Sequence, residues 1–136
     1  MSSLLDKINI DYLAAKHAQA VATCKDIENT ATKALGVLQE NGVYACFLYL
    51  FAKEKENGRK LSEKMCALLK AIGLGVPPDD TADAQKVLKF VNEDIAQNLE
   101  RLLLAKETLE QMLIYVRYGA KAGSESNPKK STEAER

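Results

Sequence analysis

The residue types that could support catalysis or metal binding are few and isolated in this sequence. His17 is the only histidine, and the three cysteines, Cys24, Cys46 and Cys66, form no Cys-x-x-Cys pair. A zinc site needs several such ligands at short spacing, and a nucleophile needs a base beside it. We therefore interpret His17 as a core or boundary residue and the cysteines as reduced core residues. We expect neither a catalytic residue nor a metal or other cofactor.

Other catalytic patterns are equally weak. Asp79 and Asp80 could suggest a metal pair, but acids at an expected helix start more often interact with the helix dipole. No P-loop is present, and the fragment GLGV at 73–76 lacks the third glycine of a dinucleotide-binding motif and the strand before it. We therefore regard an enzyme built on a helical bundle as the weakest class, and we expect no small-molecule substrate.

Basic side chains are concentrated in one stretch of a chain that is neutral overall. The formal net charge is zero, yet residues 53–70 carry six basic and three acidic side chains, and residues 79–110 carry four basic and eight acidic ones. The cluster consists of Lys53, Lys55, Arg59, Lys60 and Lys64. It straddles Asn57-Gly58, an expected turn, so its cations could converge on phosphate. A solvated rim with local Arg59–Glu63 pairing explains the same charges, and both interpretations stay open.

A smaller basic group lies near the end of the chain. Arg117 and Lys121 are one helical turn apart and lie beside Tyr115 and Tyr118. Tyrosines in this setting can stack on nucleic-acid bases, but aromatic residues at helical spacing also commonly pack in a core. The group is therefore a second candidate contact with nucleic acid.

Composition and periodicity predict an all-α protein. Hydrophobic residues make up 46% and charged residues 28% of the chain, and glycine and proline are sparse before residue 73. The spacing of apolar residues predicts six helices. They cover about residues 4–28, 30–41, 43–56, 59–72, 81–92 and 94–120.

Several residues are expected to mark the helix ends. Thr30 is a plausible N-cap for the second helix, and Asp80 or Thr81 for the fifth. Asn41-Gly42, Asn57-Gly58 and Gly73 are expected to end helices, because glycine adopts the left-handed conformation easily. We place a break near residues 92–94, because an unbroken rod of forty residues would be roughly 60 Å long.

The apolar run from Val43 to Ala52 is the most hydrophobic part of the chain. A helix that is apolar on all sides should be surrounded by others, so we expect it at the centre of the bundle. A buried strand is the competing interpretation, but no second strand-like run exists to pair with it. The run is too short to cross a bilayer, which needs about 20 residues.

The domain organisation follows from these segments. We expect a single-domain helical bundle over residues 1–121 and a disordered polar tail over residues 122–136. The first residues, MSSLLDKINID, lack a basic start followed by an apolar core, so we expect no secretory signal. Together with the reduced cysteines, this predicts a cytoplasmic protein.

Two stretches resemble one family. The first is ALGVLQENGV at 34–43, which continues into the apolar run, and the second is ETLEQMLIYVRYGAK at 107–121. They resemble the small subunit, subunit five, of the Cmr complex of type III-B CRISPR systems, in which an apolar helix, a glycine turn and a long apolar helix precede a last helix with aromatic and basic residues. The resemblance covers about residues 8–121.

The resemblance implies a function without catalysis. Such subunits stack beside backbone subunits of a filament, and several copies line the groove that holds guide RNA and target RNA. It implies that Lys16, Arg117 and Lys121 contact the RNA backbone, because they match basic positions of the family. From charge clustering alone we add Lys53, Lys55, Arg59 and Lys60 as RNA-binding residues. Backbone contacts fix position without reading sequence.

The expected partners are other Cmr subunits, further copies of this chain, guide RNA and target RNA, with no membrane. Two alternatives stay open. One is the equivalent small subunit of the Csm complex of type III-A systems. The other is a generic helical adaptor that does not bind nucleic acid, since the apolar stripes of the first and last helices suit association with protein equally well.

Overall fold

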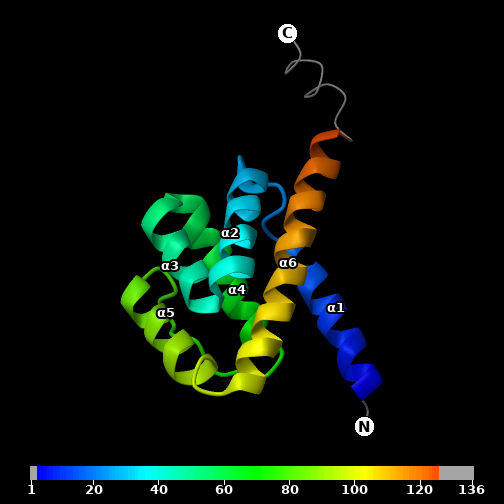
Figure 1. Ribbon diagram of the computed structural model, residues 1–136. Helices are drawn as coiled ribbons and strands as arrows, with labels where there is room; N and C mark the ends of the chain where they lie inside the picture. Colours follow the sequence, from blue (N-terminus) through cyan, green and yellow to red (C-terminus); the bar gives the residue numbers. More distant parts are fainter. Residues whose placement is uncertain (1–2, 126–136) are drawn as a thin grey trace.

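The computed structural model describes the backbone of residues 3–125 and the side chains of residues 10–123. The described residues form six α-helices and one π-helical turn and contain no strand, which confirms the predicted all-α bundle (Figure 1). The elements are α1 (Ser3–Gln19), α2 (Ile27–Asn41), α3 (Val43–Lys53), α4 (Lys55–Ala71), α5 (Ala84–Phe90), the π-helical turn η1 (Val91–Ile95) and α6 (Leu99–Glu125).

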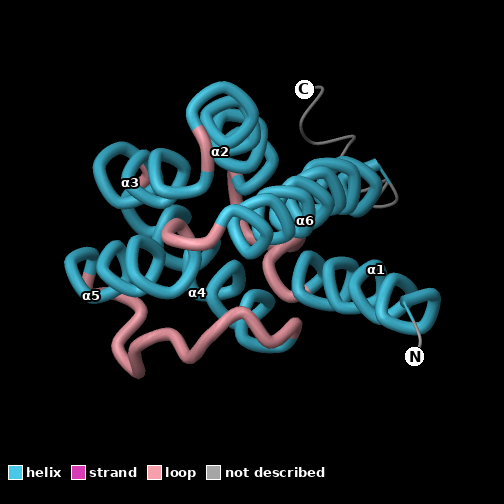
Figure 2. The backbone as a smooth tube through the Cα atoms, turned by 60° about the horizontal axis from the view of Figure 1, so that its bottom comes forward, coloured by secondary structure: helices cyan, strands magenta, loops and turns pink. Residues whose placement is uncertain are grey.

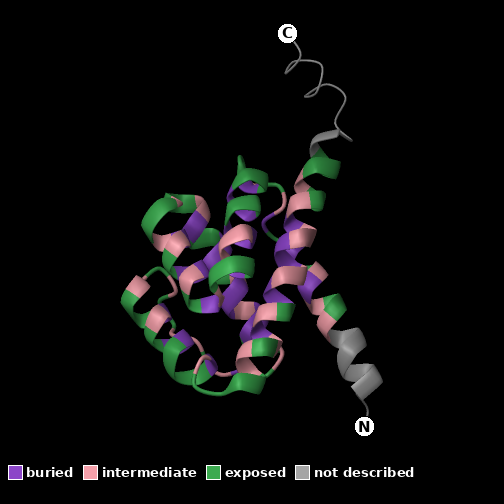
Figure 3. Ribbon diagram, in the orientation of Figure 1, coloured by how far each residue is buried: buried purple, intermediate pink, exposed green. Residues whose placement is uncertain are grey.

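The centre of the bundle is formed by α2 and α6. These two helices share the most extensive contact, and α1 lies alongside α6 on its other side (Figures 1 and 2). The inward face of α6 buries Ala105, Leu109, Met112, Leu113 and Val116, at the alternating spacing expected of one helix face. Figure 3 shows the buried residues gathered on the inner faces of the helices. Because α6 contacts both α1 and α2, it fixes their relative positions.

The apolar helix α3 does not occupy the centre, so that prediction was wrong. It is a helix and not a strand, and it packs mainly against α2 and α4, with smaller contacts to α5, η1 and α6, and leaves one face open to solvent. Val43, Cys46, Phe47 and Leu50 are buried, but Tyr44 is 42% and Leu48 is 46% exposed. An apolar sequence shows that every side of a helix tolerates burial, but it does not show which sides have neighbours.

The first predicted helix is shorter than its apolar spacing indicated. The helix α1 ends at Gln19, and residues 20–26 form turns before α2 begins at Ile27. Asp26 holds the turn in a left-handed conformation, with φ of 63°. Val21 and Ile27 are both buried, so side chains from the turn reach the core as those of a continued helix would. The turn therefore buries the same apolar residues that a continued helix would bury.

Thr30 is not the predicted N-cap, because it lies inside α2. Its hydroxyl donates to Glu54 Oε1 at 2.9 Å, and the Tyr49 hydroxyl donates to Glu54 Oε2 at 2.6 Å. Glu54 is the single residue between α3 and α4, with φ of −117° and ψ of 56°. The carboxylate thus ties the α3–α4 break to α2.

The predicted turn at Asn57-Gly58 lies four residues earlier, at Glu54, and both residues belong to α4. Gly58 is needed for a different reason. A β-carbon at this position would collide with the carbonyl oxygen of Leu50 at the end of α3. Glycine therefore permits the close approach of the two helices and does not end one of them.

The other glycine ends are confirmed. Gly42 follows α2 with φ of 101°, and Gly73 follows α4 with φ of 84°. The loop after Gly73 leads to α5, whose N-cap is Asp83 and not the predicted Asp80 or Thr81. The Asp83 carboxylate accepts from the Lys86 amide at 3.3 Å, whereas Asp80 accepts from the Ala82 amide within the loop.

The expected break before the last helix is present but lies later than predicted: residues 92–94 belong to a π-helical turn, and the helical conformation is interrupted at residues 96–98. The π-helical turn η1 occupies Val91–Ile95, and Asn98 caps α6 by accepting from the Arg101 amide at 3.0 Å. The Arg101 guanidinium also donates to the Leu74 carbonyl at 2.6 Å and so fastens the long loop to α6.

The acidic segment 79–110 spans α5, η1 and the first half of α6.

The last helix continues past the predicted end of the domain. Residues 122–125, expected in the polar tail, belong to α6, and residues 126–136 of that tail lie outside the described residues. Leu99, an apolar residue at the start of the helix, is 68% exposed. No helix within residues 3–125 combines the length and the apolar character that a bilayer span requires.

Candidate nucleic-acid interface

A hydrogen-bonded triad joins α1 to α6. The Tyr115 hydroxyl donates to Asp11 Oδ1 at 2.5 Å, and Gln111 Nε2 donates to the Tyr115 oxygen at 2.6 Å and to Asp11 Oδ1 at 3.2 Å. The bond to the Asp11 carboxylate stabilises the neutral phenol and raises the pKa of Tyr115. The triad places Asp11 opposite residues 111–115, and further along the chain Ala22 lies near Gly119, so the two segments run in the same general direction (Figure 1).

A shallow groove of about 330 Å³ lies between these two helices. We call it the α1–α6 groove. It is lined by small and aromatic residues and one amide: Ala15, Ala18, Gln19, Ala22, Tyr115, Tyr118 and Gly119. Its floor is largely apolar because alanine and glycine present little more than backbone and methyl groups. Ala22, in the turn after α1, lies beside Gly119 of α6: a β-carbon at Gly119 would lie 3.4 Å from that of Ala22, an ordinary van der Waals contact.

One exposed aromatic side chain, Tyr118, lines this groove, and a second, Tyr12, lies on α1 outside the lining residues. Tyr118 is 62% exposed, and the guanidinium carbon of Arg117 lies 5.6 Å from the centre of its ring, a cation–π distance. Tyr12 is 61% exposed, one turn before Ala15 on α1. Large aromatic rings at this exposure present stacking surfaces to solvent.

Three of the predicted RNA-binding cations lie on this helix pair, and we call them the α1–α6 cations. Lys16 on α1 and Lys121 on α6 are exposed, and Arg117 is half-buried. Arg117 Nε is buried and has no hydrogen-bond partner among the described residues. Arg117 therefore presents only part of its guanidinium, whereas the two lysines are free to move in solvent.

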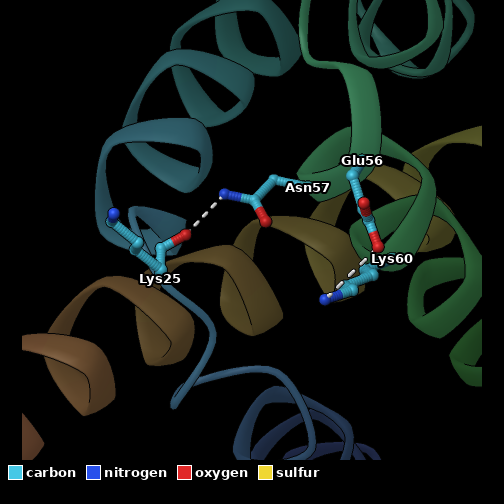
Figure 4. A network of polar contacts seen from close by, with 4 residues as sticks. All are labelled: Lys25, Glu56, Asn57 and Lys60. Atoms are coloured by element: carbon cyan, nitrogen blue, oxygen red, sulfur yellow. Dashed lines mark hydrogen bonds and ion pairs between the residues drawn. The ribbon is translucent and has the colours of Figure 1, made fainter.

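The remaining predicted RNA-binding cations, Lys53, Lys55, Arg59 and Lys60, lie where α3 meets α4. Together with Lys64, which belongs to the same basic cluster but was not predicted to bind RNA, we call them the junction cations. All are exposed except Lys64, which is half-buried. Lys60 pairs with Glu56 at 3.8 Å (Figure 4), and no pair between Arg59 and Glu63 forms among the described residues. Both partners of the observed pair are largely exposed, so it contributes little to stability.

Acidic side chains separate the four junction cations of α4 into two ridges. Along α4, Lys55 and Arg59 follow one ridge, and Lys60 and Lys64 follow another, each with four-residue spacing. Glu56 and Glu63 fall between the ridges. The predicted convergence of the cations on one phosphate is therefore weaker than the sequence indicated, because the helix spreads them over a wide face.

Lys25 is a further cation that sequence analysis did not assign to this surface. Its carbonyl accepts from Asn57 Nδ2 at 2.7 Å, which holds the turn at residues 20–26 against the start of α4 (Figure 4). Its side chain is exposed. Lys25 and Asn57 are far apart in the sequence. They meet because α1 ends at Gln19, earlier than predicted, so no local sequence pattern indicates this contact.

The turn at residues 20–26 lies between the two groups of cations. On one side it contacts the start of α4 through Asn57, and on the other it borders a depression of about 710 Å³ that reaches Ala120 and Gly123 of α6. The α1–α6 cations and the junction cations therefore flank one end of the molecule and do not form a single patch.

The residue types considered above for catalysis, the histidine and the cysteines, pack within the helices and the core. His17 Nδ1 lies 2.8 Å from the Leu13 carbonyl oxygen in its own helix. Burial raises the pKa of the Cys46 and Cys66 thiols to about 12 in each case, so neither is a thiolate at neutral pH. Within the described residues, no three His, Cys, Asp or Glu side chains gather as metal ligands would.

Comparison with known proteins gave no significant match: no family model, no curated protein and no solved structure matches this chain. We therefore infer the function from the residues themselves and from the resemblance of the two stretches described above. In the structure, the first of those stretches forms the end of α2, the Gly42 turn and α3, and the second forms most of α6. The α1–α6 cations lie on or beside the second stretch.

Proposed function

We propose that this chain is a non-catalytic small subunit of a type III-B CRISPR (Cmr) ribonucleoprotein complex in the cytoplasm. It stacks beside the backbone subunits and other copies of itself, and it contacts guide and target RNA through the α1–α6 cations and the junction cations. The observation that carries this proposal is the combination of Lys16 and Lys121, both exposed, with exposed tyrosines on two adjacent helices. Weak single contacts add up along a filament of copies.

The neutral net charge is compatible with this role. Local charge decides where RNA binds, and the acidic side chains are most frequent in residues 79–110, a segment that contains none of the α1–α6 cations or junction cations. In the proposed complex, the acidic segment faces a protein partner or solvent. The equivalent small subunit of the Csm complex has the same requirements, and the genes that flank this one distinguish the two complexes.

The test reverses charge at four exposed positions of the proposed surface. The variant replaces Lys16, Arg59, Lys60 and Lys121 with glutamate, and the measured quantity is the RNA retained by the reconstituted complex. A matched control replaces four other exposed lysines, Lys33, Lys70, Lys86 and Lys89, with glutamate. We expect RNA to be lost from the first variant and kept by the control, which has the same net charge. Equal retention by both removes the proposed surface.

A helical adaptor that does not bind nucleic acid is the second candidate function. Exposed apolar side chains favour it: Tyr44 and Leu48 follow each other one turn apart on α3, and Leu99 and Leu103 do so on α6. A partner protein or a second copy could cover such pairs. Strong self-association in sedimentation, without salt-sensitive binding of RNA, would favour this candidate over the first.

A further inference from the structure

The α1–α6 groove combines an apolar floor with aromatic walls. Tyr118 lines it from α6. Tyr12 is not a lining residue, but Tyr12, Ala15 and Gln19 follow the i, i+3, i+7 spacing of one helical stripe, which places Tyr12 one turn before the groove on α1. Both tyrosines are more than half exposed. Most aromatic side chains of this size bury their rings in a folded protein, so two exposed rings beside one apolar groove need an explanation.

The ring of Tyr118 is prepared for stacking on one face. Arg117 lies over the ring at 5.6 Å, and the high exposure of Tyr118 leaves ring surface open to solvent. The neighbouring guanidinium restricts the side chain and so reduces the conformational entropy that a ligand would have to remove. A flat ring system with an open π-face, such as a nucleobase, fits a surface of this kind.

Charge around the groove favours a polyanion over an apolar helix. Lys16 follows Tyr12 by one turn on α1, and Lys121 follows Tyr118 by nearly one turn on α6, so each aromatic wall carries an exposed cation. The acid at this interface, Asp11, already accepts from Tyr115 and Gln111. A strand whose bases reach the groove would therefore meet lysines where its phosphates pass.

We propose that the α1–α6 groove receives an unstacked nucleobase of single-stranded RNA, with Tyr118 and Tyr12 as stacking surfaces and Lys16 and Lys121 on the flanking phosphates. This inference rests on the proposed function, since it takes RNA as the ligand, and it adds that the RNA at this surface is unpaired. Bases in an A-form duplex are stacked and recessed, so a duplex can offer only phosphates and hydroxyls to the same surface.

The experiment measures binding of the full-length chain to a labelled single-stranded oligouridine and to an RNA duplex of the same length by fluorescence anisotropy. Replacing Tyr118 with alanine should weaken single-strand binding roughly 5- to 150-fold, the range of one base–aromatic stack. Tyr118→Phe keeps the ring and should bind as the wild type does. Tyr44→Ala is the matched control, because Tyr44 is an exposed tyrosine on α3, outside the groove.

Salt dependence separates stacking from charge. Lys16→Glu and Lys121→Glu should flatten the dependence of affinity on salt, because each removes a phosphate contact, whereas Tyr118→Ala should lower affinity with the salt slope unchanged. Ala15→Leu, which fills the groove at a half-buried position, should weaken single-strand binding as Tyr118→Ala does. Thermal melts of each variant test whether its fold is intact.

The outcomes distinguish the two proposals. If the lysine variants weaken binding while Tyr118→Ala and Ala15→Leu leave it unchanged, RNA is held by its backbone alone; the groove inference is then wrong and the proposed function stands. If single strand and duplex bind equally in every variant, the inference is likewise wrong. If the wild-type chain binds neither RNA in a salt-sensitive way, the groove inference is wrong, the proposed function is decided by RNA retention in the reconstituted complex, and loss of self-association in Ala15→Leu would identify the groove as a protein-docking site.

Discussion

The phenol of Tyr115 and the carboxylate of Asp11 form the shortest link between the last helix and the first, with a hydroxyl-to-oxygen distance of 2.5 Å. The two residues are separated by most of the chain, and Gln111 completes the contact from the same face of α6. This link lies beside the α1–α6 groove, and it sets the position of Tyr12 and Lys16 relative to Tyr118 and Lys121. The proposed interface therefore depends on a contact that no local pattern reveals.

The first prediction concerns this link. Tyr115→Phe keeps the ring and removes the hydroxyl that bonds to Asp11 and Gln111, so the free energy of unfolding should fall by about 1 kcal/mol, a typical net hydrogen-bond contribution. Urea denaturation measures the change. Tyr118→Phe is the control, since no described residue bonds to the Tyr118 hydroxyl, and it should alter stability by less than about 0.5 kcal/mol. Equal effects of the two substitutions would contradict the role of the triad.

The second prediction compares two glycines inside helices. Gly58→Ala places a methyl group against the Leu50 carbonyl oxygen and should destabilise the protein by about 1–3 kcal/mol. Gly36→Ala is the matched control in α2, where nothing lies within 4 Å of the added carbon. It should stabilise the protein by about 0.5–1 kcal/mol, because alanine favours the helix. Thermal denaturation of both variants tests the close approach of α3 and α4.

This comparison shows what the sequence could and could not reveal about the fold. Gly42 and Gly73 end helices as predicted, because each adopts a positive φ that glycine alone adopts without strain. Gly58 follows an asparagine in the same way as Gly42 does, but it serves close packing within a helix. The two cases are alike in sequence, and only the position of Leu50 in space distinguishes them.

The same limit applies to the candidate interface. Lys16, Arg117 and Lys121 were assigned to it by resemblance, and the structure places them on one helix pair. The turn of residues 20–26 was predicted as helix, because Val21 and Ile27 continue the apolar spacing of α1. Lys25 was therefore missed, since its proximity to α4 depends on a hydrogen bond to Asn57. Contacts between residues far apart in one chain leave no periodic pattern in its sequence.

The third prediction concerns stability at high pH. Burial, together with the hydrogen bond to Glu54 and its negative charge, raises the pKa of Tyr49 from 10 to about 12. Because the pKa is raised in the folded state, this contribution to stability is fully present below pH 10 and is lost as the pH rises from 10 towards 12. Tyr49→Phe removes that contribution.

The measurement is urea denaturation at several pH values between 9 and 12, a range that also includes the titration of the buried thiols. The buried cysteines produce a loss in the same direction, so the wild type and Tyr49→Phe are compared at each pH. The difference in unfolding free energy between them should shrink as the pH rises. A difference that stays constant across the range would show that Tyr49 does not titrate with a raised pKa.

The fourth prediction uses thiol reactivity. Burial raises the pKa of the Cys46 and Cys66 thiols to about 12, and the thiolate is the reactive form. A thiol reagent at neutral pH should therefore modify the half-buried Cys24 first, and modify the other two only as fast as the protein unfolds. Mass spectrometry of the modified protein gives the sites. In Cys24→Ser the fast phase should vanish; rapid modification of Cys46 in the native protein would contradict the described core.

The most direct test of the central claim, that α1 and α6 present an RNA-contacting surface, is ultraviolet crosslinking of the assembled ribonucleoprotein followed by mapping of the crosslinked peptides. We predict crosslinks on peptides that contain Tyr12 and Lys16, Tyr118 and Lys121, and the junction cations at the start of α4. Crosslinks confined to the acidic segment 79–110, or none on this chain while neighbouring subunits crosslink, would contradict the account.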